Sequence, residues 1–159
     1  MLTTHELLKA RFDMTRRYLD KVLIRFTEDD LSWRPADGMR TVRGQLLEIA
    51  DKERESIKWI QTGVWPDEDP PTFDEETATM AEIAAAMKQL RLNTFAYLDS
   101  LSEADLGRLI HSEEGWLEAL TLTDCPMHEV LRNIAAHEWY HTAQLITYLG
   151  RRGDDLDSW

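Results

Sequence analysis

Two histidines placed four residues apart are the clearest chemical feature of the sequence. His137 and His141 occur in the segment HEWYH. Residues four apart lie one above the other on one face of a helix, so both imidazoles could reach a single metal ion. The same helical face carries apolar residues and is expected to point inward, where two neutral imidazoles need partners for their ring nitrogens. A metal ion would satisfy both, and ordinary core hydrogen bonds are the alternative.

The same segment fits the H-E-x-x-H pattern of zinc peptidases. A peptidase of that kind needs a third protein ligand downstream of the motif. Residues 151–159, which follow the predicted helix, contain neither Glu nor His. The sequence therefore argues against a peptidase. Glu138 is expected to be a surface residue or a polar residue between helices.

The third ligand is expected to come from another helix, and two glutamates of the segment QLLEIADKE are candidates. Glu53 falls on the apolar stripe of its predicted helix, where a carboxylate needs a partner because burying it alone is costly. Periodicity therefore favours Glu53, and Glu48 is the other candidate. If Glu48 is the ligand, Glu53 and Gln144 could orient the ligands through hydrogen bonds, and core packing is the alternative for Gln144.

Four long helices are predicted from apolar side chains that recur every three and four residues. They cover about residues 4–26, 41–62, 80–101 and 126–149. A proline-rich loop separates the second from the third, and the segment before the last helix has a weak pattern that fits a short strand or a packed loop. The predicted fold is therefore all-α, a four-helix bundle with one poorly defined segment before the last helix. One domain over residues 1–150 and a polar tail over 151–159 are expected.

Other reactive side chains are given structural roles. Asp124 is a candidate cap for the last helix, which opens at Pro126. The remaining histidines and the single cysteine are expected to be surface, capping or packing residues: His5, His111, His128 and Cys125.

Composition excludes several classes of protein. The chain has 159 residues and a formal net charge of -12, and no basic stripe that could neutralise the phosphates of a nucleic acid. No apolar run approaches the ~20 residues of a membrane span. The single cysteine excludes an internal disulfide framework. A cytoplasmic protein that binds neither nucleic acid nor membrane is expected.

Two segments resemble those of a known family. LSWRPADGMRTVRGQLLEIADKE resembles the turn and second helix of the DinB/YfiT-like family (the DinB superfamily) of metal-dependent four-helix-bundle enzymes, and HEWYHTAQLITYLG resembles its last helix. The order of the predicted helices matches that family over the whole chain, and recognisable sequence motifs cover roughly a quarter of it. It implies a bundle with an unusual connection order, pairing as a homodimer, and a divalent metal held by three histidines.

The resemblance also favours Glu48 over Glu53 as the third metal ligand. His137 and His141 match two of the family's ligands, and Glu48 stands where the family usually has the third histidine. The implied metal site is therefore Glu48, His137 and His141. Two imidazoles and a carboxylate can hold zinc, nickel, iron or manganese, so the identity of the ion stays open. A site that has lost its metal is the alternative.

The function implied by the resemblance is a metal-dependent enzyme with a small-molecule substrate. Characterised members include S-transferases and isomerases that use low-molecular-weight thiols, and a hydrolase is the nearest variant. No catalytic residue beyond the metal ligands is identified. The alternative function is a non-catalytic, stress-induced helical dimer or binding protein with a structural or lost metal site.

Overall fold

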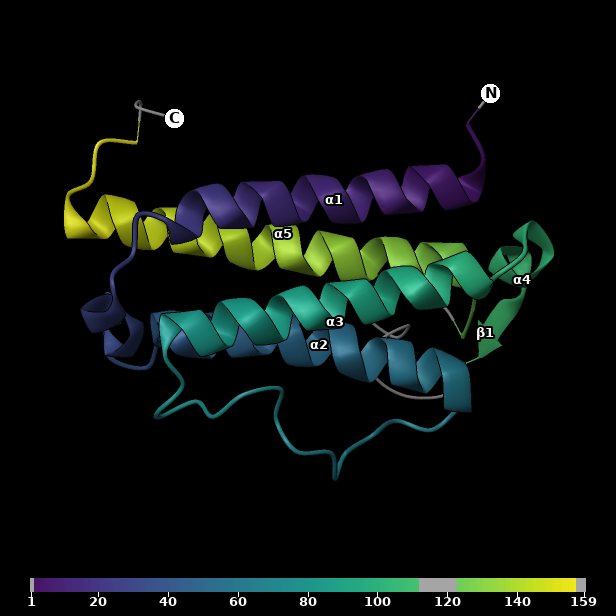
Figure 1. Cartoon of the computed structure of the whole chain (residues 1–159), viewed down its shortest axis with the longest axis horizontal. Coiled ribbons are helices and arrows are strands. Elements are labelled where there is room, and N and C mark those ends of the chain that lie inside the picture. Colours follow the sequence, from purple (N-terminus) through teal and green to yellow (C-terminus); the bar gives the residue numbers. More distant parts are fainter. Residues whose placement is uncertain (1, 112–122, 157–159) are drawn as a thin grey trace.

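The computed structural model describes residues 2–111 and 123–156. Four long helices lie side by side along the molecule: α1 (Thr4–Leu23), α2 (Val42–Thr62), α3 (Met80–Ser100) and α5 (Met127–Arg152) (Figure 1). The smaller elements are a 3-10 helix η1 (Glu28–Ser32), the short helix α4 (Glu103–Gly107) and two strands, β1 (Leu109–His111) and β2 (Asp124–Pro126). The strands pair antiparallel at one end of the bundle, with Ile110 opposite Cys125. The predicted all-α four-helix bundle is confirmed.

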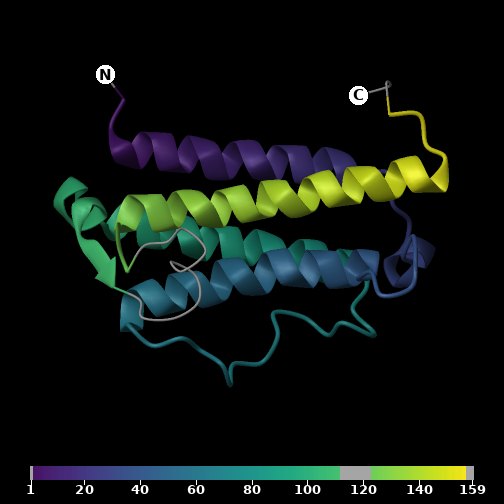
Figure 2. The same cartoon turned by 180° about the vertical axis from the view of Figure 1, so that it is seen from behind.

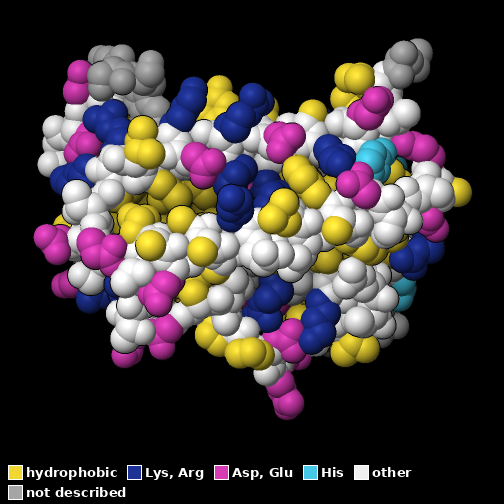
Figure 3. Space-filling view, viewed as in Figure 1, with side chains coloured by type: hydrophobic (Ala, Val, Ile, Leu, Met, Phe, Trp, Pro, Cys, Tyr) yellow, Lys and Arg dark blue, Asp and Glu magenta, His cyan; other side chains and the backbone are white. Residues whose placement is uncertain are grey.

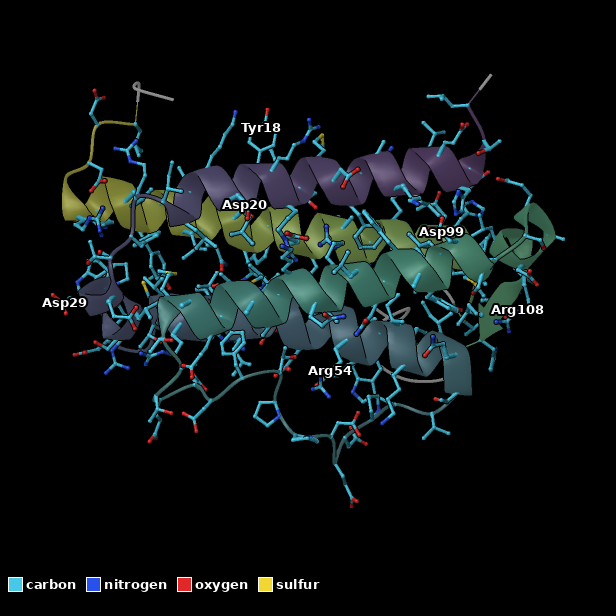
Figure 4. All side chains as sticks on the ribbon, in the orientation of Figure 1. Tyr18, Asp20, Asp29, Arg54, Asp99 and Arg108 are labelled. Atoms are coloured by element: carbon cyan, nitrogen blue, oxygen red, sulfur yellow. The ribbon has the colours of Figure 1, made fainter. Side chains whose placement is uncertain are left out.

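The connections have an unusual order. α1 and α5 run in one direction, and α2 and α3 both run in the other, so the chain must cross the length of the bundle between α2 and α3 (Figures 1 and 2). Arg54 on α2 points toward this crossover segment and donates to Asp69 at 3.3 Å (Figure 4). Asp51 accepts hydrogen bonds from the backbone nitrogen and the hydroxyl of Thr72 at 2.8 and 2.7 Å. These contacts hold the crossover against α2.

The helices begin where the sequence supplies hydroxyl caps. The side chains of Thr3, Thr41 and Thr79 accept backbone N–H groups at the first turns of α1, α2 and α3. α2 ends at Gly63, whose φ of 76° is a left-handed conformation that glycine adopts without steric cost. Every residue of the predicted apolar stripe of α2 is buried: Val42, Leu46, Ile49, Glu53, Ile57 and Ile60.

The structure differs from the sequence prediction around α5. The helix continues to Arg152, because Gly153 and not Gly150 adopts the left-handed conformation that ends it. Arg152 then pairs with Asp30 at 2.7 Å and with Asp154 at 2.8 Å. Asp124 is not the cap of α5, because it lies in β2. The strand or loop predicted around residues 116–122 lies outside the described residues.

None of the described helices combines the length and the apolar character that a membrane span requires.

A layer of buried charges crosses the middle of the bundle. Each long helix contributes one member: Arg16 from α1, Glu53 from α2, Arg91 from α3 and Glu138 from α5. Arg91 Nε donates to Glu53 Oε1 at 2.9 Å, and its Nη2 also binds Glu138. Arg16 Nε donates to Glu138 Oε1 at 2.7 Å. Apolar clusters occupy the two sides of this layer, with Phe12 and Leu19 of α1 in different clusters.

The charges of this layer neutralise one another. Burial by itself would raise the pKa of Glu53, but the charge and hydrogen bonds of Arg91, together with Arg16 and Thr94, lower that pKa below its usual value. The Glu53 carboxylate is therefore ionised at neutral pH. Arg16 and Arg91 each pair with both Glu53 and Glu138. Removing one member of a fully paired, buried ion cluster is costly, because the charges that remain lose their partners.

Replacing Arg91 by methionine should therefore destabilise the protein strongly. We expect Arg91→Met to lower the free energy of unfolding by about 3–5 kcal/mol, measured by urea denaturation followed by circular dichroism. Arg132→Met is the control, because Arg132 pairs with Glu129 at 3.1 Å on the exposed surface. That pair should be worth less than about 1 kcal/mol. Equal effects of the two substitutions would contradict a stabilising role for the buried layer.

Candidate metal centre

α2 and α5 lie side by side on the face shown in Figure 2 and bring three potential metal ligands together. One ligand atom from each of Glu48, His137 and His141 lies within 4.8 Å of the others. The Nε2 atoms of His137 and His141 are 3.1 Å apart, and Glu48 Oε1 is 3.8 Å from His137 Nε2. The structure thus places the three residues selected from the sequence at one point.

A chain of hydrogen bonds fixes which nitrogen of His141 carries its proton. The Arg40 carbonyl can only accept, so the Tyr148 hydroxyl donates to it at 2.8 Å. The Tyr148 oxygen then accepts from Gln45 Nε2 at 3.0 Å. This turns Gln45 Oε1 toward His141 Nδ1, which must be the donor. In the neutral imidazole, Nε2 of His141 is therefore an acceptor, and without a metal it accepts a hydrogen bond from His137 Nε2–H at 3.1 Å.

The two imidazole nitrogens have the spacing of metal ligands. Nitrogens bound to tetrahedral zinc at ~2.0–2.1 Å lie about 3.3 Å from each other. The observed separation of 3.1 Å between the two Nε2 atoms is close to this value. The donor set, two imidazoles and one carboxylate, leaves a position for water or substrate, as in catalytic sites. These residues therefore fit a divalent cation.

Electrostatics keep both imidazoles neutral and ready to bind a cation. Burial lowers the pKa of His137 to about 4, with further lowering by His141, Lys52 and Arg40. Burial also lowers the pKa of His141. At neutral pH neither imidazole carries the second proton that would give it a positive charge and oppose metal binding.

Arg40 positions the carboxylate of Glu48. Its Nη2 donates to Glu48 Oε2 at 2.8 Å, while Glu48 Oε1 faces His137. One oxygen is held by the arginine and the other is directed toward the imidazoles. The two outer ligands are only partly covered, since the side chains of His137 and Glu48 are 22% and 34% exposed. Solvent can therefore reach the site from this side.

The periodicity argument for Glu53 as the third ligand was wrong. Its carboxylate lies in the buried charge layer, where Arg91 and Thr94 bind it, and it neither ligates nor orients the histidines. Glu138, the glutamate of the H-E-x-x-H segment, belongs to the same layer and is 2% exposed. Its carboxylate pairs with Arg16 and Arg91, so it is a polar residue between helices and is not placed as a peptidase base.

The remaining histidines and the cysteine have structural partners. His5 and His128 bond the carbonyls of Leu98 and Leu106, each at 3.0 Å. His111 pairs with Asp124 at 3.0 Å in the exposed hairpin. Cys125 is buried, and burial followed by the charge of Glu129 raises the pKa of its thiol. A raised pKa disfavours the reactive thiolate.

Sequence reasoning missed Gln45 and Arg40. Gln45 lies one helical turn before Glu48, a spacing that places both side chains on the same side of α2. That spacing could have indicated from the sequence that Gln45 lies near the metal ligands. Arg40 precedes the helix, and its contact with Glu48 depends on the turn at Gly38, where φ is 81°. No helical pattern could place it.

One cavity lies beside the site, and another lies away from it, between α1 and α3. The first, of about 290 Å³, is lined by Arg40, Gln45, Gln144 and Tyr148 among others. The second, of about 310 Å³, lies where apolar and basic side chains meet on the surface (Figure 3). Arg16 and Arg91 line this second cavity, but both already bind the carboxylates of the charge layer.

The low pKa of His137 should make the metal-free protein sensitive to acid. The unfolded chain takes up a proton near pH 6.5, while the folded chain does so only near pH 4, so stability falls as the pH falls between these values. Between about pH 7 and about pH 4.5 this site should remove roughly 2 kcal/mol of unfolding free energy. Urea denaturation of chelator-treated protein, compared with His137→Gln, measures the difference. An identical pH dependence in the two proteins would contradict the prediction.

Comparisons with known proteins agree with the fold. A comparison with curated proteins finds no match. The crystal structure of a conserved protein from Enterococcus faecalis is similar, with a TM-score of 0.67 and 13% sequence identity over 96% of this chain and 97% of that chain. The family model of the DinB superfamily matches residues 11–145. With the predicted bundle observed and most of its length matched, the chain belongs to the DinB superfamily.

Proposed function

We propose that this protein is a metal-dependent enzyme whose divalent cation is held by Glu48, His137 and His141. The observation that carries the proposal is the pair of Nε2 atoms 3.1 Å apart, on imidazoles that burial keeps neutral. Arg40 and Gln45 support the proposal, because Arg40 hydrogen-bonds Glu48 and Gln45 hydrogen-bonds His141. Zinc, nickel, iron(II) and manganese all suit two imidazoles and one carboxylate.

A bound divalent cation supplies a nucleophile at neutral pH, because it lowers the pKa of a coordinated thiol or water. The chain's own residues have other tasks. Gln45 and Tyr148 hold His141 in one tautomer and one orientation. Arg40 fixes Glu48, and the neighbouring cavity offers room for a small molecule.

A thiol-dependent S-transferase is the reaction class we favour, on the basis of the family resemblance, and a hydrolase that uses water is the variant. The expected homodimer and the cytoplasmic location stay predictions. A non-catalytic protein with a structural metal or none would still fold in the same way, since the buried charge layer does not involve Glu48 or the histidines.

Metal content tests the proposal. Untagged protein, purified without chelator and measured by mass spectrometry, should contain about one divalent metal ion per chain. Glu48→Gln and His137→Ala should each lose most of it. His128→Ala should keep it, because His128 lies on the same helix but bonds the Leu106 carbonyl. Protein without metal that also takes up none of the four candidate ions would refute the proposal.

Gln45 should matter for metal affinity although it is not a ligand. Gln45→Leu removes the acceptor for His141 Nδ1–H and frees the imidazole to change tautomer. Loss of such a supporting hydrogen bond typically weakens metal binding about 10–100-fold. A competition titration with a coloured zinc chelator measures this, and circular dichroism checks the fold. Unchanged zinc affinity in folded Gln45→Leu would show that the hydrogen-bond chain does not prepare His141.

A further inference from the structure

The surface that α1 and α5 share exposes aromatic and apolar side chains. Met14 and Tyr18 of α1 are 38% and 42% exposed, and Trp139 of α5 is 43% exposed. The rings of Tyr18 and Trp139 meet edge to face, with their centroids 4.8 Å apart. Figure 4 shows Tyr18 on the outer side of α1, away from the other helices. Exposed apolar patches that are rimmed by polar residues mark interaction sites.

Four cations surround these apolar side chains. Arg11 and Arg132 line a cavity of about 240 Å³ between the two helices. Arg17 and Lys21 line another, of about 270 Å³. The described residues that line these two cavities include no carboxylate, although the chain has a formal net charge of -12. We call the four cations and the three exposed apolar residues the α1–α5 face: Arg11, Met14, Arg17, Tyr18, Lys21, Arg132 and Trp139.

Within the described part of the chain, three of the four cations have no carboxylate partner. Arg132 pairs with Glu129 at 3.1 Å. Lys21 Nζ lies 5.5 Å from the centroid of the Tyr18 ring, so this cation is held beside an aromatic side chain. The nearby Asp20 lies on the other side of α1, where it lines the cavity against α3. The N–H groups of the face can therefore donate to the carboxylates of a partner.

Charge and shape favour an acidic protein segment as that partner. A second copy packed about a two-fold axis would oppose the cations of the face to the same cations. Nucleic-acid binding commonly uses about 6–10 phosphate contacts, more than four cations supply. More than half of each apolar side chain is covered, so the face offers hollows and no protruding anchor for a membrane. A peptide can place both apolar and acidic side chains in such hollows.

We propose that the α1–α5 face binds a short acidic segment of a partner protein. Its apolar side chains would pack in the cavity beside Met14 and Trp139, and its carboxylates would bind the four cations. The face contains none of the three candidate metal ligands, which lie together between α2 and α5. The inference therefore goes beyond the proposed function, and its test is independent of metal binding.

Selection from a phage-displayed library of random twelve-residue peptides tests the chemistry of the partner without assuming a sequence. We expect the wild-type protein to enrich peptides that combine several Asp or Glu residues with aromatic or aliphatic ones. Fluorescence polarisation then measures the affinity of the most enriched peptide. Arg11→Glu combined with Arg132→Glu, and separately Trp139→Ala, should each weaken its binding at least about tenfold, because arginine and tryptophan residues carry much of the binding energy of interfaces.

Arg34→Glu combined with Lys88→Glu is the matched control. It changes the net charge by the same amount at two exposed cations outside the face. This variant should bind the peptide as the wild-type protein does, and circular dichroism checks that every variant is folded. An equal loss of binding in the control would mean that only net charge matters. Enriched peptides without acidic residues would give the partner another chemistry, and either result overturns the proposal.

Two further measurements address the other occupants. The wild-type protein should bind the enriched peptide more tightly than single-stranded oligothymidine or vesicles that contain phosphatidylserine, and tighter binding of either would overturn the proposal. Sedimentation velocity should give the same oligomeric state for the wild-type protein and Trp139→Ala. A dimer that dissociates on this substitution would show that a second copy covers the face, which also overturns the proposal.

Discussion

The buried charge layer is the constraint on which the rest of the structure depends. Four helices meet at Arg16, Glu53, Arg91 and Glu138, and each carboxylate is bound by both arginines. Sliding one helix by a turn would leave buried charges unpaired, at a cost of several kcal/mol. Apolar packing alone tolerates such shifts better, because hydrophobic contacts are not directional. The layer therefore sets the register of the bundle.

That register determines where the candidate metal ligands lie. Glu138 turns inward to the arginines, and its neighbours His137 and His141 consequently face α2. On α2, Glu53 takes the inward position and Glu48, five residues earlier, faces the histidines. Each of these two helices thus presents one carboxylate to the charge layer and separate groups to the site. The segment HEWYH uses its histidines and its glutamate for different tasks.

Much of this arrangement could be predicted from the sequence. Regular apolar spacing gave the long helices, and the four-residue spacing of His137 and His141 gave their common face. The choice between Glu48 and Glu53 could not be made from periodicity, because a helix between two neighbours buries two faces and the arginine partners of Glu53 come from α1 and α3. Arg40 and the hairpin of β1 and β2 depend on long-range contacts that no local pattern encodes.

Anomalous diffraction from crystals grown with zinc would test the central claim most directly. The account predicts one strong peak at about 2.0–2.2 Å from the Nε2 atoms of His137 and His141 and from a Glu48 oxygen. It also predicts that Gln45 Oε1 still accepts from His141 Nδ1 in that crystal. A peak elsewhere, for example at the exposed pair of His111 and Asp124, with none between α2 and α5, would contradict it.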